Sequence, residues 1–247
     1  MNFKITLQYD GTEFHGWQMQ GDLRTVQGEL TNALSLIDSR PVIVQGSGRT
    51  DAGVHAQGQV ASVNLQKQIT ANKLRAAING NVGKDLRAMS VETVSDDFHA
   101  RYSALDKTYR YRIVNGPVIS PFLVRFAHHE ARQLDVERMK DVARLFLGEH
   151  DWTAFASAQS DSETKTRTLT EINVSEQCLE GSRVIDVSVT AEGFLRYMVR
   201  SIAGTLMAVG RGEMDNALVQ RAIDAGDRSL VAATAPACGL TLMSVRY

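Results

Sequence analysis

Alternation of apolar and polar residues is the clearest pattern in the first part of the chain. It predicts four strands there, at residues 3–9, 42–44, 57–65 and 86–94. Two segments between these strands carry apolar residues at helical spacing, and each follows a threonine that can cap a helix, Thr25 or Thr70. The predicted order, strand-helix-strand-strand-helix-strand, is the split β-α-β arrangement of ferredoxin-like and RNA-recognition folds.

The same order of elements is predicted again after residue 105, although no sequence repeat is visible. The predicted strands are 108–114, 168–175, 183–191 and 240–247, and the predicted helices are 135–147, 194–209 and 216–224. We therefore expect an α+β protein of two ferredoxin-like or RRM-like (β-α-β-β-α-β) halves, with domains at 1–105 and 106–247. The halves should join in an extended mixed, mainly antiparallel sheet with helices on one face and an inter-domain cleft.

A glycine-rich loop, GSGRTDAGVHA at residues 46–56, separates the second and third predicted strands. It contains more charged and polar groups than a simple turn requires. Because glycines allow a left-handed backbone and close approach to a ligand, the loop can hold Asp51 and Arg49 in one geometry at the end of a sheet. The alternative is a tight connection with solvated charges. His55 is expected to be structural.

Composition narrows the class of protein. The chain has 247 residues, of which 43% are hydrophobic and 22% charged, and these values exclude disordered and fibrous classes. No apolar run could span a bilayer and no signal peptide begins the chain, so we expect a cytoplasmic protein without a membrane partner. Cys178 and Cys238 are isolated and lack metal-ligand spacing, so reduced thiols and no metal site are expected.

Positive charge is clustered in the sequence although the net charge is −1. Arg101 and Lys107 lie in one cluster, and Arg196 and Arg200 lie four residues apart, on one face of the helix predicted at 194–209. An arginine in apolar surroundings usually pairs with a carboxylate, so this helix could supply a partner for Asp51. Each cluster could equally be a solvated surface.

Five motifs resemble those of the TruA-type tRNA pseudouridine synthases. They are YDGTEFHGWQ at 9–18, the loop at 46–56, FHAR at 98–101 with KTYRY at 107–111, FLRYMVR at 194–200, and PACGLTL at 236–242. The motifs occur in the family's order and cover the chain from end to end.

The resemblance implies an isomerase that detaches uracil from C1′ of a ribose in tRNA, turns the base and rejoins it through C5. The family's aspartate corresponds to Asp51, which would attack C6 or C1′ or stabilise positive charge at C1′. Tyr109 corresponds to the active-site tyrosine, expected to stack on the base and help remove the C5 proton, and Arg200 to the arginine that pairs with the aspartate. No oxidation state changes and no group is gained or lost, so no cofactor and no metal is expected.

The resemblance also implies roles for other residues and for partners. Arg49 would hold the flipped nucleotide or bind its phosphate, Leu240 would pack against the base, and the basic residues Arg101, Lys107 and Arg196 would bind tRNA. The family works as a homodimer, with target uridines at positions 38–40 in the anticodon stem-loop.

Two other classes of function are weighed against this one. A non-catalytic RNA-binding protein of paired RRM-like domains would fit the fold, but residues 57–65 lack the aromatics with which such domains stack RNA bases. A nucleoside hydrolase or phosphotransferase using the glycine loop is disfavoured because no P-loop Lys-Ser/Thr follows GSG.

Overall fold

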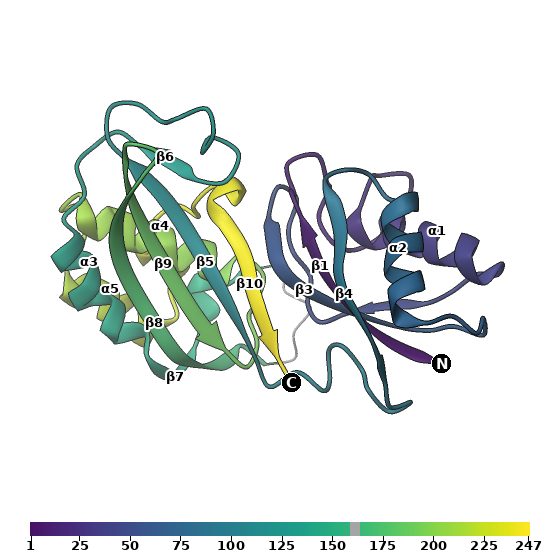
Figure 1. Ribbon diagram of the computed structural model, residues 1–247. Helices are drawn as coiled ribbons and strands as arrows, with labels where there is room; N and C mark the ends of the chain where they lie inside the picture. The colour runs from purple at the N-terminus through teal and green to yellow at the C-terminus, as the bar shows by residue number, and fades with distance from the viewer. Residues whose placement is uncertain (159–163) are drawn as a thin grey trace. The chain divides into compact units, whose positions relative to one another are not determined.

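The structure, a computed structural model, describes residues 1–158 and 164–247 and divides into two compact units (Figure 1). The first unit contains residues 1–105 and 242–247, and the second unit contains residues 106–241. Each unit combines β-strands with α-helices, so the predicted α+β class is confirmed. In the described residues no helix is both long and apolar enough to cross a membrane. The inter-domain cleft stays a prediction.

The first unit shows the predicted order of elements. These are β1 (Asn2–Tyr9), α1 (Val26–Asp38), β2 (Val44–Gly46), β3 (His55–Asn64), α2 (Ala71–Asn81) and β4 (Leu86–Val94). The strands lie in the order β4-β1-β3-β2, and these three pairings are antiparallel. Thr25 caps α1 as predicted, because its side chain accepts a hydrogen bond from the Gly28 N–H, whereas Thr70 makes no such bond to α2.

The second unit has more strands than predicted. It contains β5 (Asp106–Asn115), β6 (His128–Glu130), α3 (Val136–Ala143), β7 (Gly148–Asp151), β8 (Thr166–Leu179), β9 (Ser182–Ala191), α4 (Met198–Gly210) and α5 (Asn216–Ala225). The antiparallel order is β5-β9-β8-β7, and β6 pairs with β5 in parallel, which makes the sheet mixed. Figure 1 shows α3, α4 and α5 on one face of these strands, as expected. The last strand, β10 (Leu240–Arg246), begins in this unit and ends in the first, next to β3.

Two helices of the second unit differ from their predicted bounds. α3 ends at Ala143, and a 3-10 turn at Arg144–Phe146 takes the place of its predicted last turn. α4 begins at Met198 instead of residue 194, because Tyr197 has a left-handed φ of 69°, which an α-helix cannot contain. Arg196 therefore precedes the helix. The prediction that Arg196 and Arg200 share one helical face is wrong.

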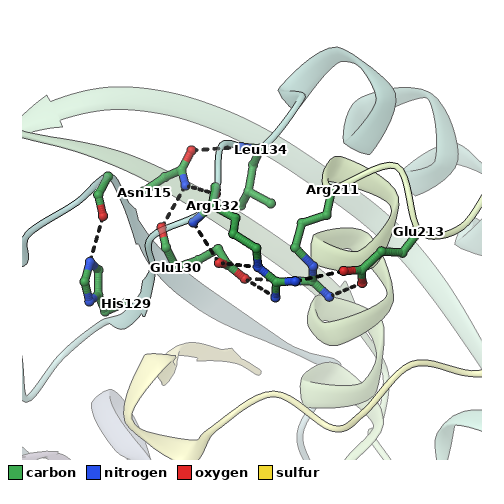
Figure 2. A network of polar contacts seen from close by, with 8 residues as sticks. Asn115, His129, Glu130, Arg132, Leu134, Arg211 and Glu213 are labelled. Carbon is green, nitrogen blue, oxygen red and sulfur yellow. Dashed lines mark hydrogen bonds and ion pairs between the residues drawn. The ribbon is translucent and has the colours of Figure 1, made fainter.

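A polar network joins β6 to the C-terminal end of α4 (Figure 2). Asn115 Nδ2 donates hydrogen bonds to the carbonyl oxygens of Glu130 and Arg132, at 2.8 and 2.7 Å. The buried carboxylate of Glu130 pairs with Arg132 and, at 3.0 Å, with Arg211, which directly follows α4 and also bonds Glu213. Burial alone would raise the pKa of Glu130, but the bonds and charges of the two arginines outweigh burial and lower it.

We expect Glu130→Gln to destabilise the protein at pH 7 by about 1–3 kcal/mol, because the paired arginines lose their buried counter-charge. A carboxylate whose pKa is lowered by folding stabilises the protein fully above its unfolded-state pKa of about 4.3. That contribution is lost as the pH falls through the lower folded-state pKa. Urea unfolding at pH 7 and at several lower pH values down to pH 3 measures this effect. The difference in free energy of unfolding between wild type and variant should become smaller as the pH falls.

Glu149→Gln is the matched control, because Glu149 is exposed on β7. It should leave the free energy of unfolding nearly unchanged. The role assigned to the Glu130 carboxylate would be contradicted if the free energies of unfolding of wild type and Glu130→Gln differed by the same amount from pH 7 to pH 3.

Candidate active site

Four buried polar side chains, which we call the anchor network, hold the loop between β2 and β3: Tyr9, Ser47, Thr50 and Gln59. Ser47 Oγ donates to Gln59 Oε1 at 2.7 Å, and Gln59 Nε2 donates to the carbonyl oxygen of Gly48 at 3.0 Å. The Tyr9 hydroxyl and Thr50 Oγ1 form a hydrogen bond of 2.8 Å. Burial raises the pKa of Tyr9 to about 12, so the network is uncharged at neutral pH.

Main-chain hydrogen bonds fix the loop on both sides of Asp51. The Trp17 N–H donates to the carbonyl oxygen of Thr50 at 2.9 Å, and the Val54 N–H donates to the carbonyl oxygen of Asp51 at 3.1 Å. The Asp51 side chain is half-buried between buried Thr50 and exposed Ala52. These bonds fix the main chain from which the Asp51 side chain extends.

The segment at 9–18 lies directly against the loop at 46–56. Gly16 has a φ of 87°, and a Cβ atom at this position would lie 2.6 Å from the carbonyl oxygen of Thr50, so only glycine fits. Buried His55 joins the same two segments, because its Nδ1 accepts a hydrogen bond from the Gly11 N–H at 2.9 Å. Two motifs far apart in sequence thus form one structure around Asp51.

In the second unit, β5 places Tyr109 and Tyr111 on one face. Tyr111 is fully buried and its hydroxyl donates to the carbonyl oxygen of Pro236 at 2.9 Å. Burial raises the pKa of Tyr111 well above its ordinary value. Tyr109 is 7% exposed, and its ring meets the ring of Phe194 edge to face, with centroids 5.1 Å apart.

Arg200 is the one residue of α4 that is not fully buried. Its Nε donates to the carbonyl oxygen of Ala235 at 2.8 Å, and its guanidinium lies 4.9 Å from the centroid of the Tyr197 ring. Burial raises the pKa values of Tyr111 and Cys238, and the charge of Arg200 offsets part of each increase. Arg200 therefore acts electrostatically on the tyrosine face of β5.

Leu240 follows a 3-10 turn that lies against the same tyrosine. A Cβ atom on Gly239, the last residue of the turn Ala237–Gly239, would lie 2.6 Å from Tyr111 Cζ. Leu240 itself is buried at the start of β10. Tyr109, Arg200 and Leu240 thus all belong to elements that contact or surround Tyr111.

The predicted site residues divide between the two units. The first unit contains Asp51 with exposed Arg49 and Arg101. The second unit contains Tyr109, Arg200, Leu240, half-buried Lys107 and exposed Arg196. Among the described residues no group of three or more His, Cys, Asp and Glu side chains could hold a metal ion.

The sequence analysis did not identify the anchor network or Tyr111 as parts of the site. A signal for each exists in the sequence. Gln59 is a polar residue at an inward position of an otherwise apolar alternation, which is unusual unless the amide is hydrogen-bonded. Tyr111 lies two residues from Tyr109 and therefore on the same face of the strand.

Comparison with known sequences gives concordant results. A family model described as tRNA pseudouridine synthase matches residues 5–103 and 142–247. A tRNA pseudouridine synthase A from Bacillus sp. (strain KSM-64) is 40% identical over 247 residues, covering 100% of this chain and 99% of the relative. One from Brevibacillus brevis is 41% identical over 244 residues, covering 99% of this chain and 98% of the relative. A tRNA pseudouridine synthase A 2 from Clostridium perfringens is 39% identical over 246 residues, covering 100% of this chain and 99% of the relative.

The chain therefore belongs to the tRNA pseudouridine synthase family. It is an isomerase that converts uridine to pseudouridine in tRNA, as the motifs predicted, and not a non-catalytic RNA-binding protein.

The anchor network makes a testable contribution to stability. We expect Gln59→Ala to lower the free energy of unfolding by about 1–3 kcal/mol or more, because the Ser47 hydroxyl and the Gly48 carbonyl lose buried partners. Chemical denaturation measures this change. Gln57→Ala is the control, since Gln57 is exposed on the same strand. Equal stability of the two variants would show that the network does not hold the loop.

Proposed function

We propose that Asp51 is the carboxylate that reacts with the target uridine of tRNA, as nucleophile on C1′ or C6 or as the group that stabilises positive charge at C1′. The observation that carries this proposal is the backbone on either side of Asp51, which is hydrogen-bonded to buried groups while the side chain itself is half-buried. A catalytic group needs this kind of support, because small displacements from the reactive geometry cost much of the rate.

The isomerisation conserves all atoms. The bond between N1 and C1′ breaks, a bond between C5 and C1′ forms, the proton on C5 leaves, and N1 gains a proton. Asp51 assists the first step. Tyr109 stacks on the detached base and helps to remove the C5 proton, which fits a tyrosine whose ring already meets Phe194 edge to face.

In this proposal Arg200 is the arginine that pairs with the Asp51 carboxylate in the reacting complex and orients it. Its support in the second unit is the Ala235 carbonyl on one side and the Tyr197 ring on the other. Leu240 packs against the base, and Arg49, which is exposed beside Asp51, holds the flipped nucleotide or its phosphate.

The substrate region is the anticodon stem-loop, with uridines 38–40 as targets, and the enzyme works as a cytoplasmic homodimer. Support for this part of the proposal comes from the five motifs that the chain shares with the family. A phosphate could reach the basic residues proposed to bind tRNA, because Arg101 and Arg196 are exposed and Lys107 is half-buried.

We expect Asp51→Asn to lower kcat by about 100-fold to 1,000-fold or more, because the amide keeps the shape of the side chain but can neither attack nor carry a negative charge. Affinity for tRNA should stay within about threefold of wild type, since phosphate contacts supply most of it. The assay is release of tritium from unmodified tRNA labelled at C5 of uridine, with filter binding for affinity.

Asp22→Asn is the control for this experiment, because Asp22 is an exposed carboxylate of the same unit. It should leave both kcat and affinity unchanged. An Asp51→Asn enzyme that turns over at the wild-type rate would exclude Asp51 as the reacting group.

A further inference from the structure

Tyr197 has a backbone conformation that its position does not explain. Within the described residues, three residues other than glycine have a positive φ: Ser39 at 57°, Glu180 at 49° and Tyr197 at 69°. Ser39 ends α1, and Glu180 forms the short turn between β8 and β9, both places where left-handed residues are common. Tyr197 instead precedes the first residue of a helix, where an extended backbone is usual.

Helix capping does not account for the conformation. A residue before a helix normally accepts a hydrogen bond from the first turn through its side chain, and Tyr197 makes no such bond. A bulky residue in the left-handed region is strained, so the surrounding structure must hold it there. Here the Ser157 N–H donates to the Arg196 carbonyl at 2.9 Å, and the Ser201 N–H donates to the Tyr197 carbonyl at 2.8 Å.

The Tyr197 ring contacts two arginines. The guanidinium of Arg196 lies 5.0 Å from the ring centroid, and that of Arg200 lies 4.9 Å from it, both within the range of cation–π attraction. Arg200 Nε also donates to the Ala235 carbonyl at 2.8 Å, and the Ala235 N–H donates to the Arg200 carbonyl at 3.1 Å. The Arg200 guanidinium is therefore held by an aromatic ring and by a carbonyl oxygen.

We propose that Tyr197 is a positioning residue that fixes the guanidinium of Arg200 for the isomerisation. With the usual extended backbone, the Tyr197 side chain would leave the main chain in a different direction. The left-handed conformation is thus retained for the geometry of Arg200 and not for the stability of α4. This inference rests on the proposed pairing of Arg200 with Asp51.

The test compares two substitutions at residue 197. Asn accepts the left-handed backbone but has no ring, so Tyr197→Asn should unfold at the same or a higher denaturant concentration than wild type. Its kcat should fall about tenfold or more while KM for tRNA stays within about twofold, because Arg200 is displaced and the RNA contacts remain. Tyr197→Phe keeps the ring and should keep kcat within about twofold.

Glu180→Asn is the matched control, since Glu180 is also left-handed but lies in the turn that joins β8 to β9. It should leave kcat unchanged. A Tyr197→Asn enzyme with wild-type kcat would overturn the proposal. So would a rise in KM alone, which would make the ring an RNA contact, or a loss of stability that matches the loss of rate.

A second arm separates this proposal from the function of Arg200 itself. Arg200→Ala alone should lower kcat, and adding Tyr197→Asn to it should cause no further loss, because the ring acts through the guanidinium. An Arg200→Ala enzyme with wild-type kcat would exclude the proposed role of Arg200 in the reaction. A further loss of rate in the double variant would show that Tyr197 does not act through Arg200.

Discussion

The buried hydrogen bonds of the anchor network are the constraint on which the rest of the site depends. A buried amide or hydroxyl without a partner is costly, so Tyr9, Ser47, Thr50 and Gln59 have one low-energy arrangement, and that arrangement fixes the loop. Burial keeps the Tyr9 phenol protonated, so the support does not change with pH in the neutral range. The main chain that carries Asp51 is thus supported by hydrogen bonds between uncharged groups.

The second unit supports its catalytic candidates in a different way. α4 is buried everywhere except at Arg200, so packing fixes the helix and leaves one charged group at its surface. The C-terminal end of the helix is joined to β6 through Arg211 and Glu130 (Figure 2). At the N-terminal end, Tyr197 has a left-handed backbone, and its ring centroid lies 4.9 Å from the Arg200 guanidinium. Packing thus fixes the body of α4, and the strained residue lies at its N-terminal end.

The sequence predicted elements wherever one face of a strand or helix is buried over many residues, as in β1, α1 and β3. It did not predict β6 and β7, because their sequences, HHE and GEHD, contain no apolar residues whose alternation would mark a strand. The start of α4 was also missed, since nothing in the local sequence marks a tyrosine as left-handed. Asp51 could be proposed from the sequence because its loop is richer in functional groups than a turn requires. The groups that support the loop were missed because residues 9, 50 and 59 meet only through tertiary pairing.

Hydrogen exchange of the Trp17, Gly53 and Val54 amides in the free enzyme tests the central claim most directly. All three donate hydrogen bonds within the structure around Asp51. If the loop is held before tRNA binds, these amides are protected to nearly the same degree as those in the middle of β1 and β3. Exchange as fast as that of an exposed loop, with protection gained only when tRNA is added, would contradict the account.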